Sequence, residues 1–411
     1  MSRLLFISIL LATGLWSTVL SAAALSLSEA TQRVLTKNPQ ISLSDALEQA
    51  AAGRASQAGI LPNPELSYQL EDFSRDTQRS ANQATTTFSL SQQFSLPGKR
   101  SARMAVANDE QALVKVDGLS QRLSLIRLTH DRYAEAVAAQ EQLSIAEQSH
   151  VLAKQAYDAV SARVDAGRVS PIELSRASVA LKAAQREVAT QKQFQLLAQR
   201  QLASLWGERE LVESLTGSLV LPQSLTEDVA PINKIPLLKR ADIQVKKEQA
   251  ALRLAQAERV PDFTLMAGMK RDADTRDESL LIGVSIPIPL FNRNQGSVLS
   301  ARSELAAAEA EQALIKQQWV TLRDQLETQR AASYQEALQL RDDVLRVARE
   351  AAEATQIGYQ AGKFSLLDLL DAQRILIDSQ SQYLSARLSF FRSNAALNEL
   401  LGFVHSDGNS L

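Results

Sequence analysis

The sequence contains the same motif twice, about half the chain apart. The stretch 166–174 (AGRVSPIEL) reappears as 361–369 (AGKFSLLDL), and 205–207 (LWG) reappears as 400–402 (LLG). Self-similarity at one fixed spacing indicates a repeated architecture. Because the spacing is so long, it predicts the duplication of a half-protein and does not suit a short-repeat solenoid.

The composition excludes several classes of function. The chain has 411 residues, a net charge of -2, three histidines and no cysteine. There is no basic excess to bind nucleic acid, and disulfides, thiolate metal sites and a lipid-anchored cysteine are excluded. We find no phosphate loop, nucleophile motif or soft-metal ligand set, so we expect no enzyme, no cofactor and no tight metal site. Only 15 Gly and 11 Pro predict few turns and long elements.

Residues 1–24 read as an export signal. Arg3 supplies the positive charge, an apolar stretch follows, and small residues at 21–24 suit cleavage. The alternative is a short transmembrane anchor. No second apolar run of about 18 residues follows, so we expect an exported protein with no other membrane-spanning helix.

Two segments alternate between apolar and polar residues. In 64–96, Leu66, Tyr68 and Leu70 alternate with polar neighbours, and 261–290 repeats the pattern after Pro261. A period of 2 predicts strands with one apolar and one polar face. We therefore expect one strand hairpin in each half, joined across a polar linker.

A proline-free stretch follows each predicted strand hairpin. It runs from about 101 to 164 in the first half and from about 297 to 361 in the second. Each stretch would extend about 95 Å as one helix. An Ala-Gly turn and a return helix then complete helical hairpins at about 101–205 and 297–401. The resulting domains are repeat 1 (25–207), a linker (208–236), repeat 2 (237–402) and a tail (403–411).

Apolar residues at spacings of three and four predict a seam on each long helix. The seam of the first helix contains Val116, Leu119, Leu123, Ile126, Tyr133 and Val137, with His130 in the same stripe. The seam of the second helix contains Leu340, Val344, Val347, Ala351 and Ala354.

The expected fold is mainly α: long antiparallel helical hairpins with four membrane-facing β-strands, internally duplicated. Four strands are too few to close a barrel, and open edges cannot face lipid. If these strands face a membrane, several copies must therefore pool them to close a barrel. The alternative from composition alone is an extracellular coiled-coil protein with small β caps.

Several motifs, in order along nearly the whole mature chain, resemble the TolC-like outer-membrane efflux proteins, and more closely their CzcC/CusC-type heavy-metal branch. The motifs lie at 37–39 (KNP), 61–64 (LPNP), 96–100 (LPGKR), 286–296 (IPIPLFNRNQG) and 358–362 (GYQAG). The resemblance implies a homotrimer with a twelve-stranded barrel in the outer membrane of a Gram-negative bacterium, in contact with its lipid, and a helical tunnel through the periplasm. It also implies docking to a periplasmic adaptor (membrane fusion) protein and an inner-membrane resistance-nodulation-division pump.

The resemblance further implies a gate at the periplasmic tips of the helical hairpins. Asp368 and Asp371 match acidic residues of the family's constriction, and Tyr359 and Glu173 match its latch. Three copies would stack two carboxylate rings that favour cations. The family's arginine is replaced by Phe364, and Lys363 or Arg168 is the nearest basic substitute. The simpler reading is that the two aspartates are solvated residues at a helix start.

By the same resemblance, the adaptor contact lies on the same tips. The predicted contact residues are Gly167, Arg168, Ser170, Gly362, Lys363 and Ser365. The chain is thus expected to be the exit duct of a tripartite efflux system for heavy-metal cations. The alternatives are a duct for drugs or secreted protein, a periplasmic adaptor, and a structural coiled-coil protein.

Overall fold

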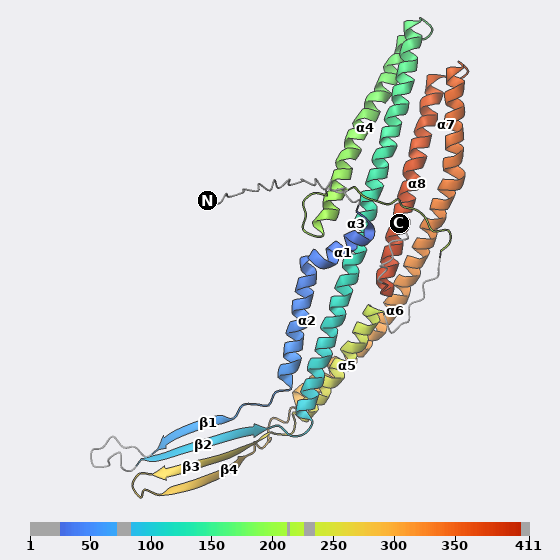
Figure 1. The fold of residues 1–411 in the computed structure, drawn as a ribbon. Helices are drawn as coiled ribbons and strands as arrows, with labels where there is room; N and C mark the ends of the chain where they lie inside the picture. The colour runs from blue at the N-terminus through green and yellow to red at the C-terminus, as the bar shows by residue number, and fades with distance from the viewer. Residues whose placement is uncertain (1–24, 72–83, 212–213, 226–234, 404–411) are drawn as a thin grey trace, which may run out of the picture.

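The computed structural model describes residues 25–71, 84–211, 214–225 and 235–403. The predicted signal peptide and most of the predicted tail lie outside these residues. The chain is elongated, with a sheet at one end, a helical body in the middle and two helical hairpins at the other end (Figure 1). This is the mainly α, internally duplicated fold with four strands that the sequence predicts.

Two halves follow one another in chain order. The first half comprises α1 (Leu27–Lys37), α2 (Pro39–Ala58), β1 (Glu65–Glu71), β2 (Thr85–Phe94), α3 (Lys99–Asp165) and α4 (Pro171–Ser204). The second half comprises α5 (Pro236–Ala257), β3 (Phe263–Asp272), β4 (Glu278–Ser285), α6 (Gln295–Gln339), the π-helical turn η3 (Leu340–Val344), α7 (Leu345–Gln360) and α8 (Leu366–Leu401).

The four strands form one antiparallel sheet in the order β1-β2-β3-β4. The central pair, β2 with β3, comes from different halves, so the sheet itself joins the repeats. The register places Tyr68 beside Phe88, and Phe88 beside Met269, on one face. That face carries the exposed apolar residues Leu66, Tyr68, Leu70, Phe88, Leu90, Leu265, Met269, Leu280, Ile282 and Val284.

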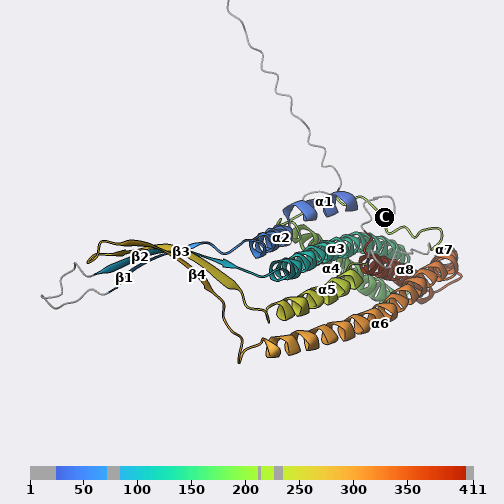
Figure 2. The same ribbon diagram turned by 90° about the horizontal axis from the view of Figure 1, so that it is seen from below.

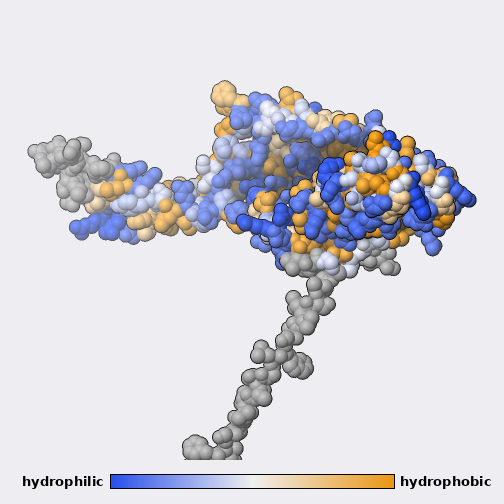
Figure 3. Space-filling model, turned by 90° about the horizontal axis from the view of Figure 1, so that it is seen from above, coloured by the Kyte–Doolittle hydropathy of each residue, from blue (hydrophilic) through white to orange (hydrophobic). Residues whose placement is uncertain are grey.

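The opposite face of the sheet is mostly polar. It carries Ser67, Gln69, Thr87, Ser89 and Thr264. Figure 3 shows hydrophobic residues gathered on part of the sheet, whereas hydrophilic residues dominate much of the helical body. The alternation predicted from sequence therefore gives two chemically different faces.

The strand predicted to reach residue 290 ends earlier. β4 stops at Ser285, because Pro287 and Pro289 have no N–H to continue a ladder. The apolar alternation nevertheless continues, and Ile286, Ile288 and Leu290 remain exposed.

Helices near the sheet lie side by side in a curved layer. α2 packs on α3, α3 on α5, and α5 on α6, and Figure 2 shows this succession. α3 contains 67 residues, which corresponds to about 100 Å. It begins directly after Gly98, whose φ of 104° makes the sharp turn out of β2. The layer has the form of a wall segment.

The seam predicted on the first long helix is largely correct. Val116, Leu123, Ile126, Tyr133 and Val137 are buried. Leu119 is the exception, with 37 % of its surface exposed. Tyr133 donates its hydroxyl proton to the carbonyl oxygens of Leu25 and Thr216 and so fixes the strap, residues 214–225, across the middle of the helical body.

The seam predicted on the second long helix is wrong by one residue. Val344 and Val347 are exposed, and the buried positions are Leu345, Ala348 and Ala352. The cause is η3, which inserts one extra residue into the helix and moves the buried stripe to the next position. A periodicity of 3.6 continued without interruption could not anticipate this shift.

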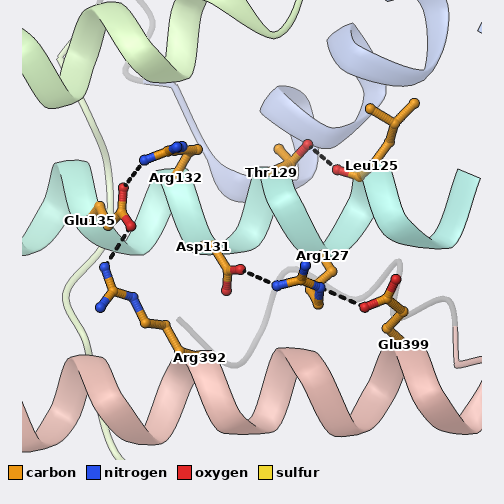
Figure 4. Close-up of polar contacts among 8 residues, drawn as sticks. All are labelled: Leu125, Arg127, Thr129, Asp131, Arg132, Glu135, Arg392 and Glu399. Atoms are coloured by element: carbon orange, nitrogen blue, oxygen red, sulfur yellow. Dashed lines mark hydrogen bonds and ion pairs between the residues drawn. The ribbon is translucent and has the colours of Figure 1, made fainter. Parts of the chain in front are cut away.

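Ion pairs join α3 to α8 along the middle of the body (Figure 4). Arg127 Nε lies 2.5 Å from Glu399 Oε2, and Arg392 Nη2 lies 2.5 Å from Glu135 Oε1. Arg387 pairs with Glu141 further toward the tips. Since each pair takes one residue from each half, these contacts hold the two repeats together.

Candidate functional site

Both helical hairpins turn in the same way at their tips. Gly167 and Gly362 have φ values of 69° and 71°. The N–H of Arg168 donates to the carbonyl of Arg163 at 2.9 Å, and the N–H of Lys363 donates to that of Gly358 at 2.8 Å. This is a glycine-closed helix end, which satisfies carbonyls that a helix otherwise leaves unpaired.

The return helices begin with serine caps. Ser170 accepts from the N–H of Ile172, and Ser365 accepts from the N–H of Asp368. The six residues expected to contact an adaptor, Gly167, Arg168, Ser170, Gly362, Lys363 and Ser365, are all exposed on these two turns.

Asp368 is held at the start of α8. Its carboxylate accepts from the N–H of Ser365 at 2.9 Å and from the Ser365 hydroxyl at 2.7 Å, which completes a capping box. These hydrogen bonds hold the pKa of Asp368 below its usual range. Its carboxylate therefore stays ionised at neutral pH.

Asp371 lies one turn further along α8 and is also exposed. Its carboxylate is 2.7 Å from the guanidinium of Arg374, a residue that the sequence reasoning did not consider. The two aspartates thus share a face but differ in partner: one caps its own helix and the other has a basic neighbour.

Tyr359 lies where the two hairpin tips pack together. Its side chain is 3 % exposed and belongs to an apolar cluster from both hairpins with Ala156, Val160, Ala177, Leu366 and Leu369. Burial raises the pKa of the Tyr359 hydroxyl; the charge of Arg163 opposes this shift, and the charge of Glu173 on α4 adds to it. Within the described part of the chain, that hydroxyl has no hydrogen-bond partner.

The guanidinium beside Tyr359 belongs to Arg163. Its Cζ lies 4.4 Å from the centre of the Tyr359 ring, and its Nη2 donates to the Tyr359 carbonyl at 2.7 Å. Neither Arg168 nor Lys363, the substitutes expected from sequence, makes this contact. Arg163 occupies the last turn of α3, so finding it required knowledge of how the two tips pack.

Phe364 explains the glycine at position 358. A Cβ added to Gly358 would lie 2.1 Å from Phe364 Cδ2. The ring of Phe364, at the position where the resemblance led us to expect an arginine, therefore covers the last turn of α7.

No group of three or more His, Cys, Asp or Glu side chains suited to a metal ion occurs among the described residues. Within the same ranges, no helix is long and apolar enough to cross a membrane.

Comparison with known protein families identifies the family of this chain. The model of the outer membrane efflux protein family matches residues 30–208 and 232–403. The chain belongs to this family. The two matched segments coincide with the two halves of the duplication, and the membership puts the chain in the outer membrane with its helical body in the periplasm.

Individual proteins are similar to this chain in sequence or in fold. The efflux protein is 29 % identical to the cobalt-zinc-cadmium resistance protein CzcC of Cupriavidus metallidurans over 85 % of this chain and 83 % of the relative. It is 26 % identical to the nickel-cobalt-cadmium resistance protein NccC of Alcaligenes xylosoxydans xylosoxydans, over 74 % of this chain and 69 % of the relative. In fold it is similar to the outer membrane protein VceC of Vibrio cholerae, with a TM-score of 0.76 at 21 % identity, over 92 % and 96 % of the two chains.

Proposed function

We propose that this protein is the outer-membrane exit duct of a tripartite efflux system, that it works as a homotrimer, and that it exports heavy-metal cations. The observation that carries the proposal is the sheet, with one apolar face, one polar face and two open edges. Such a sheet suits a membrane only if neighbouring copies cover its edges.

A trimer is favoured by the exposed apolar residues of the second long helix. Five of these residues have exposed fractions between 42 % and 61 %: Leu314, Val320, Val344, Val347 and Ile357. These residues lie along α6, η3 and α7, which form one border of the curved layer in Figure 2. A second copy packed against this border would bury them, as a closed cylinder requires.

The proposed gate lies at the hairpin tips. Asp368 and Asp371 from three copies would form two carboxylate levels around one axis, and Tyr359 and Glu173 would belong to the contact that holds the hairpins together. Support comes from the ionised state of Asp368 and from the exposure of both carboxylates. Rings of carboxylates favour cations over anions.

The same tips are proposed to receive a periplasmic adaptor protein, which would connect the duct to an inner-membrane pump of the resistance-nodulation-division type. Support comes from the exposure of Gly167, Arg168, Ser170, Gly362, Lys363 and Ser365. Crosslinkers placed at Arg168 and Lys363 should capture the adaptor, whereas adducts found only near the strands would exclude this contact.

Heavy-metal cargo rests on the names of the relatives CzcC and NccC. Deletion of the gene in its host should raise sensitivity to zinc, cobalt, cadmium or nickel salts, and the plasmid-borne gene should restore resistance. Sensitivity to drugs or loss of a secreted protein, with metal tolerance unchanged, would assign the duct to the alternative cargo.

The channel itself is tested in a planar bilayer. The purified protein should have the mass of three chains in detergent and give a small, cation-selective conductance. Asp368→Ala combined with Asp371→Ala should lower the cation selectivity. A protein that stays soluble without detergent and does not conduct would exclude the duct.

A further inference from the structure

The contact between Arg163 and Tyr359 joins the two repeats at the proposed gate. Arg163 is in the last turn of α3, in the first hairpin, and Tyr359 is in the last turn of α7, in the second hairpin. Nη2 of Arg163 donates to the carbonyl oxygens of Tyr359 at 2.7 Å and of Gln360 at 3.2 Å. One side chain therefore holds the end of a helix that belongs to the other hairpin.

Three physical effects act together in this contact. The last carbonyls of a helix lack intrahelical donors, and the guanidinium supplies one. A positive charge at a helix C-terminus is favoured by the helix dipole. The guanidinium also lies over the ring of Tyr359, 4.4 Å from its centre, at the distance of a cation–π contact.

The Tyr359 hydroxyl makes no hydrogen bond in this contact, although the charge of Arg163 acts to lower its pKa. The buried hydroxyls of Tyr133 and Tyr334 both donate to main-chain carbonyls. That of Tyr359 has no partner among the described residues. Here the tyrosine contributes its ring and its backbone oxygen, so a phenylalanine would present the same two features.

We propose that Arg163 is the positioning residue of the closed tip, and that it latches the two hairpins within one protomer through the ring and carbonyl of Tyr359, independently of the tyrosine hydroxyl. This proposal rests on the proposed function of the tips as a gate. It assigns to α3 the arginine that the loop after α7 lacks, where Phe364 stands instead. Each protomer then carries its own complete latch.

Four single variants and one double variant separate this latch from one based on the hydroxyl. Arg163→Ala removes the guanidinium, and Tyr359→Leu removes the ring; both should raise the single-channel conductance several-fold. Arg163→Lys should give an intermediate increase, because an ammonium cannot donate as a planar fork or stack as well. Tyr359→Phe should leave the conductance at the wild-type value. The double variant Arg163→Ala/Tyr359→Leu should conduct no more than either single variant.

A covalent link distinguishes a latch from a merely structural residue. The chain has no cysteine, so Arg163→Cys/Gln360→Cys introduces the only two thiols. This variant should conduct like Arg163→Ala. A bifunctional thiol reagent about as long as an arginine side chain should return the conductance to the wild-type value, and a reductant should reverse this if the reagent forms disulfides.

Two results would overturn the proposal: Tyr359→Phe that conducts as much as Tyr359→Leu, or Arg163→Ala that conducts like wild type. If Arg163→Ala does not assemble, Arg163→Lys and the crosslinked variant decide in the same way. Failure of the duct itself would be distinct, because the wild-type protein and every variant would then lack conductance in the bilayer.

Discussion

Lys99, the first residue of α3, and Asp262, directly before β3, form an ion pair of 2.6 Å. Gln93 also donates to the Asp262 carboxylate, at 3.2 Å. The side chains of Lys99 and Asp262 are only 12 % and 24 % exposed. This pair fixes the point where β3 of the second half meets the start of α3 of the first half.

Removing the amine of this pair should destabilise the protein. Lys99→Met leaves the Asp262 carboxylate partly buried without its cation, at an expected loss of about 1–3 kcal/mol. Arg122 and Asp45 form a matched pair, also at 2.6 Å but 40 % and 49 % exposed, so Arg122→Met should cost less than about 1 kcal/mol. Denaturation in detergent measures both, and equal losses would contradict the role of burial.

The extra residue of η3 should be dispensable. Deleting the exposed Asp343 converts the π-helical turn into ordinary helix and keeps Leu345 and Tyr359 on the buried side. Lys154 is an exposed residue of α3, which has no extra residue to lose at this point. Deleting it should rotate the rest of the helix by about 100° and displace Val160 from its buried position.

Thermal unfolding of the two deletion variants provides the measurement. The Asp343 deletion should unfold close to the wild-type temperature, and the Lys154 deletion should yield little folded trimer. If both deletions are equally damaging, the π-helical turn is not a simple one-residue insertion.

Asp131 should give the protein an unusual pH dependence. Burial raises the pKa of this carboxyl, against the opposing charge of Arg127 2.7 Å away. A raised pKa in the folded state means that folding favours the protonated acid. The contribution of Asp131 to stability therefore falls as pH rises from its ordinary pKa of 3.8 through the raised value, and then stays level.

Asp131→Asn removes this ionisation and keeps an oxygen that accepts from Arg127. The stability difference between variant and wild type should grow in favour of the variant as pH rises through that window. Melting temperatures at a series of pH values above about 4 measure this difference. Parallel curves for the two proteins would show that Asp131 titrates normally.

Neighbouring residues of β4 should respond differently to charge. Ile282 lies on the apolar face and Leu281 on the opposite one. Ile282→Arg should destabilise the membrane-inserted protein by about 2–4 kcal/mol if the site is near the bilayer centre. Leu281→Arg should be tolerated. Heat-modified mobility of outer-membrane fractions compares the two, and a reversed order would put the lipid on the other face.

The sequence allowed more of the fold to be predicted than of the site. Some features depend only on residues that are close together in the sequence, and these could be predicted. They are the strand alternation, the glycine turns at Gly167 and Gly362, and the length of the helices. The η3 insertion has no local signal, because Leu340, Val344 and Val347 continue a plausible period. Arg163 could not be identified either, since its contact with Tyr359 depends on the packing of two hairpins far apart in the sequence.

The two repeats contact each other at several places along the molecule. The central strand pair, the ion pair of Lys99 with Asp262, the pairs between α3 and α8 and the contact of Arg163 with Tyr359 each combine one residue from either half. The chain is thus a covalent pseudodimer whose halves interlock instead of standing beside each other as separate modules. Two genes, one for each half, should be able to encode the protein only if both products fold together.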